Sequence, residues 1–283
     1  MKIGVIGLGL IGGSLAKAIM LTENHSVYGT DINETVISKA MLVGAIDGRL
    51  SKEECSDCDM LILALFPSST LEVLSEYAPY IKKGAVVLDT CGVKRSVCDA
   101  AFDIAEKYGF SFVGAHPMAG IEKNGFSASK YNLFEDASIV LVPKKGFDIE
   151  ELDSVRKFFL SIGFSHVVFS DAYTHDRLIS YTSQLAHIVS SAYIKNPLSC
   201  QARGFSAGSF RDMTRVATLN EVMWTELFLA NSDCLADQLA TLIDELERYK
   251  NALEEGNKDE LLDLLREGRE AKAKSEESMK DSK

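Results

Sequence analysis

The sequence has no long hydrophobic run, no excess of positive charge and few closely spaced cysteines. No apolar stretch approaches the ~20 residues that a membrane-spanning helix needs, and the N-terminus lacks the apolar core and cleavage site of a signal peptide. The net charge of −11 at pH 7 argues against a general affinity for nucleic acid or for anionic membranes. We therefore expect a soluble, cytoplasmic protein.

Cysteine is too sparse to indicate a metal site or a disulfide framework. Of the six cysteines, only Cys55 and Cys58 lie close together in the sequence. A zinc site would need a second such pair or nearby histidines. We expect reduced thiols and no bound metal.

A glycine-rich turn near the N-terminus predicts a dinucleotide-binding site. Residues 3–6 read as an apolar strand, the motif Gly7-x-Gly9-x-x-Gly12 follows, and a helical pattern comes next. Gly7 permits a tight turn, Gly9 lets the backbone approach a pyrophosphate, and Gly12 lets the helix pack close to the strand. The helix amides then face the phosphates. The predicted cofactor-binding residues of this turn are Gly7, Leu8, Gly9, Leu10, Ile11 and Gly12.

An acidic residue indicates which dinucleotide binds. Asp31 ends the second predicted strand, about 20 residues after the glycine motif. A carboxylate there binds the ribose 2′-hydroxyl and repels a 2′-phosphate, so we predict NAD. Leu65, near the end of the predicted strand at 60–66, and Cys91, just after the strand at 85–89, are expected to line the same cofactor, since ligands bind at the carboxyl ends of the strands. For the turn around Cys91, a purely local hydrogen-bonding role is the alternative.

The order of patterns predicts the fold. At ~150 residues per domain, 283 residues allow two domains. Residues 1–170 alternate strands with helices, which predicts an α/β domain with a Rossmann-type, doubly wound and largely parallel sheet. Residues 171–270 show helical periodicity alone, and the charged tail at 271–283 is expected to be disordered. The predicted strands cover residues 3–6, 25–31, 60–66, 85–89, 111–114, 138–142 and 166–169.

A heptad pattern in the helical part suggests a helix that packs against another. From Phe228 onward, apolar residues recur every seven positions through Tyr249, interleaved with leucines from Leu239 to Leu253. Such a seam fits a partner helix in a second subunit as well as a core helix of the same chain. Periodicity alone leaves both interpretations open.

His116, in a short loop after the strand at 111–114, is a candidate catalytic residue. The proline that follows it favours an extended backbone at the histidine. A histidine titrates near neutral pH, so it can accept a hydroxyl proton while a hydride leaves the carbon. A histidine that serves only the backbone of a turn is an equal alternative from position alone.

Residues 115–125 (AHPMAGIEKNG) resemble the signature of the prephenate dehydrogenases, whose close relatives are the arogenate dehydrogenases. The likeness covers nearly the whole chain except the tail. It continues at residues 174–177 (THDR), 183–187 (SQLAH) and 208–217 (GSFRDMTRVA), at Met223 and Trp224, and at Asn231.

The resemblance implies an NAD-dependent enzyme that oxidises and decarboxylates prephenate to 4-hydroxyphenylpyruvate, on the route to tyrosine. It also implies that the helical domain forms a homodimer, which favours the subunit-interface interpretation of the heptads. His116 matches the catalytic histidine, hydrogen-bonded to the ring hydroxyl. The implied substrate-binding residues are Glu122, Ser183, His187, Arg211 and Arg215, with Glu122 and Arg211 near the mouth of the pocket.

The chemistry of the substrate agrees with these residue types. Prephenate carries two carboxylates, which a planar guanidinium binds through two parallel hydrogen bonds. Arg211 and Arg215 are four residues apart and would share a helix face, as would Ser183 and His187. Surface ion pairs with neighbouring acidic residues are the alternative for either arginine.

Three departures from the family pattern affect substrate preference and pH profile. Gly92 stands where many relatives have a serine, Gln184 where some have a second histidine, and Ile121 where threonine is common. The alternatives are an arogenate dehydrogenase, a non-catalytic NAD-sensing module, or a reductase of β-hydroxyacids or imines. Reductases of that last kind rely on a lysine in the helical domain, and residues 171–194 contain none.

Overall fold

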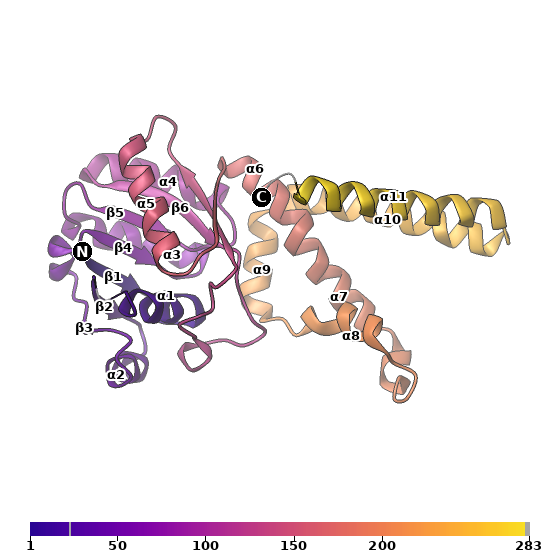
Figure 1. Cartoon of the computed structure of the whole chain (residues 1–283), viewed down its shortest axis with the longest axis horizontal. Helices are drawn as coiled ribbons and strands as arrows, with labels where there is room; N and C mark the ends of the chain where they lie inside the picture. Colours follow the sequence, from indigo (N-terminus) through magenta and orange to yellow (C-terminus); the bar gives the residue numbers. More distant parts are fainter. Residues whose placement is uncertain (23, 281–283) are drawn as a thin grey trace. The chain divides into compact units, whose positions relative to one another are not determined.

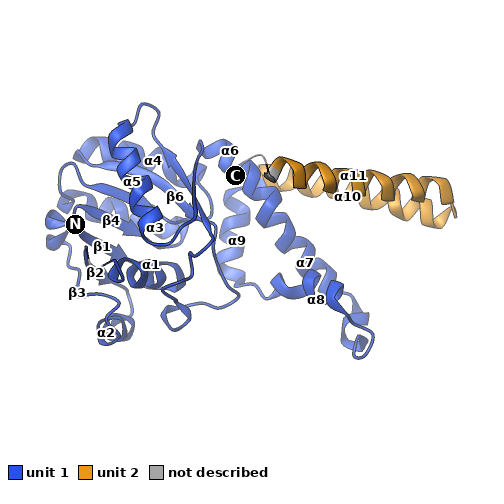
Figure 2. Ribbon diagram, in the orientation of Figure 1, with its two compact units in different colours: residues 1–232 blue, residues 233–283 orange. Residues whose placement is uncertain are grey.

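The structure is a computed structural model that describes residues 1–22 and 24–280. The chain divides into two compact units, Met1–Ser232 and Asp233–Lys283 (Figure 2). The first unit contains the whole sheet and the helices that follow it as far as residue 232. The second unit is a helical hairpin. The predicted domain boundary at residue 170 therefore lies inside the first unit, and as a boundary of function it stays a prediction.

Within the described residues, eight strands form one sheet in the order β3-β2-β1-β4-β5-β6-β7-β8 (Figure 1). All neighbouring strands are parallel except β6 and β7, which pair antiparallel. The order reverses at β1, so the carboxyl ends of β1 and β4 flank the crevice where such sheets bind ligands. The strands are β1 (Lys2–Ile6), β2 (Ser26–Thr30), β3 (Gly48–Arg49), β4 (Met60–Leu63), β5 (Val86–Asp89), β6 (Ser111–Pro117), β7 (Ser138–Pro143) and β8 (His166–Phe169).

The sheet is buried on both faces, which explains its continuous apolar strands. In β4, Met60 and Ile62 belong to one apolar core, while Leu61 and Leu63 belong to the other. Successive side chains of a strand point to opposite faces, so the two cores lie on the two sides of the sheet. Helices of the first unit cover both faces: α1 (Leu10–Met20), α2 (Glu34–Leu42), α3 (Pro67–Tyr77), α4 (Arg95–Tyr108) and α5 (Ile149–Ser161).

The chain after β8 is helical, as predicted. Asp171 caps α6 by accepting a hydrogen bond from the Thr174 amide at 2.9 Å. A π-helical segment, η4, then joins α6 to α7. The elements are α6 (Ala172–Ile179), η4 (Ser180–Leu185), α7 (Ala186–Ile194), η5 (Pro197–Gln201), α8 (Gly208–Thr214), η6 (Arg215–Ala217), α9 (Glu221–Ala230), α10 (Ser232–Glu254) and α11 (Lys258–Lys280).

The heptad helix predicted from Phe228 onward is interrupted. α9 ends at Ala230 and α10 begins at Ser232, so Phe228 lies on a different helix from the later heptad positions. Asn231 makes the break: it is fully buried, and its side-chain amide donates to the Asp176 carbonyl and to Gln184. The polar contacts of Asn231 therefore accompany a break between α9 and α10, although the heptad spacing of apolar residues continues across both helices.

The charged tail also differs from its prediction. α11 continues to Lys280, where disorder was expected from residue 271. Ion pairs four residues apart, such as Lys272 with Glu276 at 3.2 Å, support an exposed helix of this composition. The rest of the predicted tail, residues 281–283, lies outside the described residues. No helix in the described part of the chain is long and apolar enough to cross a membrane.

Candidate active site

The glycine turn has the geometry that its sequence predicts. Gly7 has a φ of +91°, and a Cβ there would lie 2.4 Å from the Ala64 carbonyl oxygen. At Gly12 a Cβ would lie 1.9 Å from the Gly7 carbonyl oxygen, so only glycine allows α1 to start this close to β1. Gly9 differs, because a Cβ there meets nothing within 4 Å. Its open face leaves the backbone accessible to a ligand.

The start of α1 is free to bind an anion. Gly9 is the N-cap residue, its position has no side-chain cap, and the first turn carries no acidic residue. The uncapped amides of the first turn, which includes Leu10 and Ile11, therefore need an outside acceptor such as a phosphate. Leu8 is fully buried, and its amide donates to Asp31, so its contact with a cofactor stays a prediction.

Asp31 is tied to the glycine turn. One carboxylate oxygen accepts a hydrogen bond from the Leu8 amide at 2.9 Å, and the other accepts from the Asn33 amide at 2.9 Å. The carboxylate is partly exposed beyond the end of β2. It therefore fixes the turn and still has lone pairs for a ribose hydroxyl.

Leu65 and Cys91 lie beside the same edge of the sheet, but only Leu65 borders the turn. A Cβ on Gly7 would lie 2.9 Å from the Leu65 side chain. The Cys91 thiol is 2% exposed and lies 3.3 Å from the Thr70 hydroxyl, and burial raises its pKa. The thiol is therefore buried against Thr70, and the expectation that Cys91 lines the cofactor stays a prediction.

His116 lies at the carboxyl end of β6, beyond the last residue that pairs with β5. A Cβ added to Gly92, in the turn after β5, would lie 3.8 Å from His116 Nε2 and 3.3 Å from Leu227 of α9. The histidine, this turn and α9 therefore meet at one place. The absent Cβ at Gly92 leaves space beside Nε2.

A second histidine contacts the first. His116 Nδ1 lies 2.9 Å from His175 Nε2, and His175 Nδ1 lies 2.7 Å from Asp176 Oδ1. Burial, together with His175 and the Lys94 ammonium, lowers the pKa of His116 well below 6.5. Burial also lowers the pKa of His175, although Asp176 opposes this. Both histidines are therefore neutral near pH 7.

A buried ion pair holds the turn beneath His116. Asp89 and Lys94 are both fully buried and bonded to each other. Asp89 also accepts from the amides of Cys91 and Ala115, at 2.9 and 3.0 Å, and Lys94 donates to the Ala115 carbonyl at 2.7 Å. Burial disfavours the ammonium, but the Asp89 carboxylate raises the pKa of Lys94. The pair therefore joins the end of β5 to β6 next to His116.

Ser183 and His187 lie on either side of the junction of η4 with α7. His187 Nδ1 donates to the Ser183 carbonyl oxygen at 2.8 Å, which leaves Nε2 as the ring nitrogen available to a ligand. The imidazole packs on the Trp224 ring of α9, with 4.0 Å between ring centroids. The π-helical turn at Ser183 is a local irregularity of a kind that often occurs at functional sites.

Arg215 and Glu122 form an ion pair, which brings the loop after β6 to η6. The Arg215 side chain is 66% exposed, so this pair lies at the surface. Arg211 lies on α8, which ends at Thr214, and Arg215 begins the 3₁₀ turn η6, so the expectation that the two share a helix face stays a prediction. Arg211 is exposed on α8.

Sequence reasoning missed the buried polar groups behind His116. His175 and Asp176 stand within the THDR motif, yet no role followed from it, because 59 residues separate the two histidines. Asp89 and Lys94 read only as a turn. No spacing rule predicts the contact between the two histidines, and the Asp89–Lys94 pair matters because both side chains are fully buried, which its short spacing does not reveal.

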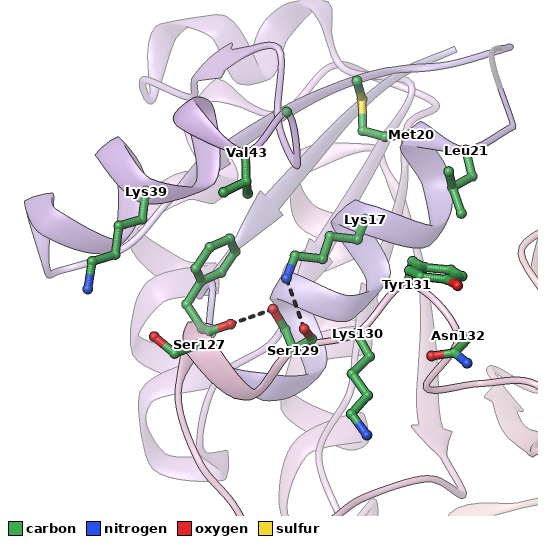
Figure 3. Close-up of a pocket in the computed structure, with 12 residues that line it drawn as sticks. Lys17, Met20, Leu21, Lys39, Val43, Ser127, Ser129, Lys130, Tyr131 and Asn132 are labelled. Carbon is green, nitrogen blue, oxygen red and sulfur yellow. Dashed lines mark hydrogen bonds between the residues drawn. The ribbon is translucent and has the colours of Figure 1, made fainter.

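A surface pocket of about 790 Å³ lies between α1, α2 and the segment at residues 126–132 (Figure 3). Lys17 borders it and donates to the Ser129 carbonyl at 2.9 Å. Lys17 follows Leu10 by seven residues, so it lies about 10 Å further along α1 than the free amides. The residues that line this pocket include none of the predicted site residues, and we assign the chemistry to the sheet edge instead.

A doubly wound sheet, an open glycine turn and a neutral histidine at the same edge define a dinucleotide-dependent oxidoreductase. Residues 15–168 match the family model described as the nucleotide-binding domain of prephenate dehydrogenase. Residues 171–267 match the model described as its dimerization domain. The chain belongs to the prephenate dehydrogenase family.

Individual relatives agree with this assignment. The chain is 30% identical over 266 residues to a prephenate dehydrogenase of Bacillus subtilis, covering 90% of this chain and 71% of the relative. It is similar to prephenate dehydrogenase of A. aeolicus in complex with hydroxyphenyl propionate and NAD+, with a TM-score of 0.85, 28% identity and coverage of 97% and 98%. It is also similar to Synechocystis arogenate dehydrogenase, with a TM-score of 0.82, 26% identity and coverage of 97% and 100%.

Proposed function

We propose that this protein oxidises and decarboxylates prephenate to 4-hydroxyphenylpyruvate with NAD. The observation that carries the proposal is the position of His116, neutral and partly buried, with Nε2 beside Gly92 at the carboxyl edge of the sheet. Arogenate, which has an amino group in place of the keto group, is the second candidate. It is favoured by the similarity to an arogenate dehydrogenase across 97% of the chain.

The glycine turn fits the cofactor. The uncapped amides of α1 suit a pyrophosphate, and the open face at Gly9 allows its close approach. Asp31 suits an unphosphorylated ribose. NAD supplies the hydride acceptor when it is bound.

His116 is the general base in this proposal. Its Nε2 takes the proton of the ring hydroxyl while the carbon bearing that hydroxyl loses hydride, which leaves a ketone. The bond between the ring and its carboxylate then breaks, and carbon dioxide departs. The electron pair of that bond makes the ring aromatic and reaches the ketone oxygen, which takes the proton back from His116. The protein's contribution is alignment and a base that is free at neutral pH.

The remaining predicted residues would hold the substrate's charges. His187 presents Nε2 from α7, and Arg215 offers a planar fork from η6. Glu122 occupies Arg215 in this structure, so a substrate carboxylate would replace Glu122 as its partner. Ser183 lies beside His187, and the exposed Arg211 would act at the mouth of the site.

We further propose that the protein is a homodimer through its helical part. The match of residues 171–267 to a dimerization domain supports this. The cytoplasmic location expected from the sequence stays a prediction.

The deciding experiment is an assay of the purified protein with prephenate or arogenate, each with NAD or NADP. We expect turnover with NAD, followed by the absorbance of the reduced nicotinamide. Absence of turnover with both acids would overturn the proposed function. A preference for NADP would overturn the role of Asp31 and leave the reaction intact.

One variant tests the role of His116 in that assay, and a second variant is its control. His116→Asn should retain NAD binding and lose about 10²- to 10⁴-fold in kcat, the usual contribution of a general base. His166→Asn removes an exposed histidine of β8 and should leave kcat unchanged. Near-normal turnover of His116→Asn would remove this histidine from the role of base.

A further inference from the structure

We propose that His175, held by Asp176, is a positioning residue that keeps the proton of His116 on Nδ1 and leaves Nε2 free. The proposal rests on the proposed function, because it concerns the base of that reaction. It begins from two hydrogen bonds in series, at 2.7 and 2.9 Å, that link Asp176 to His175 and His175 to His116.

Asp176 is a fixed, ionised acceptor. Oδ1 accepts from the Lys94 amide at 2.7 Å, and Oδ2 accepts from the Arg95 amide at 2.9 Å and from Arg95 Nε at 3.3 Å. Although burial opposes ionisation, hydrogen bonds from His175 and from these amides lower the pKa of Asp176. An ionised carboxylate has no proton to donate.

The direction of the two hydrogen bonds follows from this acceptor. His175 must donate its Nδ1 proton to Asp176, and a neutral imidazole has only one such proton. His175 Nε2 is therefore a lone-pair acceptor, so His116 must donate to it from Nδ1. The neutral His116 then carries its own lone pair on Nε2, the atom that lies beside Gly92.

Asp176 is also held through its backbone carbonyl, by a residue of another helix. Asn231, at the end of α9, donates to the Asp176 carbonyl at 2.8 Å and to Gln184 Oε1 at 2.7 Å. Gln184 in turn donates to the Leu227 carbonyl at 3.2 Å. Asn231, Gln184 and Asp176 are at most 1% exposed. α6, η4 and α9 thus fix the position from which His175 reaches His116.

The charged and titratable groups near His116 come from three elements. α6 contributes His175 and Asp176, the turn before α4 contributes Lys94, and β5 contributes Asp89. Lys94 and Asp89 neutralise each other. His175 is therefore the group whose removal most directly alters the proton on His116.

Two substitutions separate the contacts of His175. His175→Asn places an amide near the Nδ1 position, so it keeps a donor to Asp176 and loses the acceptor for His116. His175→Gln places a side-chain oxygen near the Nε2 position, so it keeps that acceptor. We expect kcat to fall about 100-fold in the Asn variant, by loss of the productive tautomer. The Gln variant should remain within about tenfold of the native enzyme.

Further readouts distinguish positioning from a general structural effect. KM for the substrate and the affinity for NAD should stay unchanged in His175→Asn. Because His175 lowers the pKa of His116, its removal should raise that pKa and move the acidic limb of the kcat/KM profile to higher pH. Nitrogen-15 NMR of the imidazoles should show the Nδ1-protonated tautomer of His116 in the native protein and a shift toward the Nε2-protonated tautomer in the Asn variant.

Three results would overturn the proposal. One is a native His116 with its proton on Nε2. Another is an Asn variant with native tautomer and pH profile. The third is an equal loss of kcat in the Asn and Gln variants. If a variant does not fold, the spectrum of the native protein decides. That spectrum needs no turnover, so the proposal can fail separately from the proposed function.

Discussion

At the scale of single residues, surroundings decide what a histidine does. His116 and His175 lie among buried groups that disfavour a positive charge. His187 has the same side chain but rests on Trp224 and donates to a carbonyl, which suits it to binding. His166 is exposed on β8. The sequence could mark His116 by its motif, whereas its protonation state depends on burial.

These lowered pKa values predict an acid-sensitive fold. In the unfolded chain both histidines take up protons with a pKa near 6.5, but in the folded state only at lower pH. The unfolded state therefore binds more protons below pH 6.5, and the free energy of unfolding should fall as pH falls through this range. Each unit of lowering corresponds to about 1.4 kcal/mol.

Urea unfolding from neutral to mildly acidic pH measures this slope. His116→Asn should show a shallower decline than the native protein, and His166→Asn should match the native slope. An unchanged slope in His116→Asn would contradict the effect of burial on His116.

At the scale of elements, the turn between β1 and α1 combines folding and binding in different glycines. Gly12 and Gly7 are required by close contacts within the turn, whereas Gly9 faces open space. The GxGxxG spacing predicted all three. The sequence did not predict the antiparallel pairing of β7 with β6. This pairing is possible because antiparallel strands need no crossover helix, and the segment between β6 and β7 contains only the 3₁₀ turn η3 (Phe126–Ala128).

Alanine substitutions separate the two roles. Gly12→Ala should destabilise the protein by about 1–3 kcal/mol or more, because its Cβ would collide with the Gly7 carbonyl. Gly9→Ala should unfold at the native temperature but bind NAD more weakly, since its methyl group occupies the approach to the backbone. Thermal unfolding and NAD titration test both. Native NAD affinity in Gly9→Ala would contradict the placement of the pyrophosphate.

At the scale of the whole molecule, the second unit exposes several large apolar side chains. The two helices pack on each other, with the Tyr249 hydroxyl donating to the Leu264 carbonyl at 3.2 Å. Leu246, Leu253 and Leu265 nevertheless remain 58%, 66% and 63% exposed. Contact with a second subunit would bury these side chains.

The double variant Leu246→Glu/Leu253→Glu should therefore be monomeric, because charges replace exposed leucines at the expected interface. The native protein should be a dimer in sedimentation velocity. Asp244→Asn changes a neighbouring exposed residue of α10 and should remain dimeric. A native monomer, or a dimeric double variant, would contradict an interface through this unit.

The sequence by itself determined the parallel part of the sheet, the glycine turn and the helical second half, and it marked His116 as a candidate. These features are local: apolar periodicity, glycine spacing and a short motif follow from neighbouring residues. Only the tertiary structure decided that Cys91 points inward, that Asn231 splits the heptad helix, and that His175 and Asp176 stand behind His116. Such features depend on contacts between residues far apart in the chain, and no periodicity encodes them.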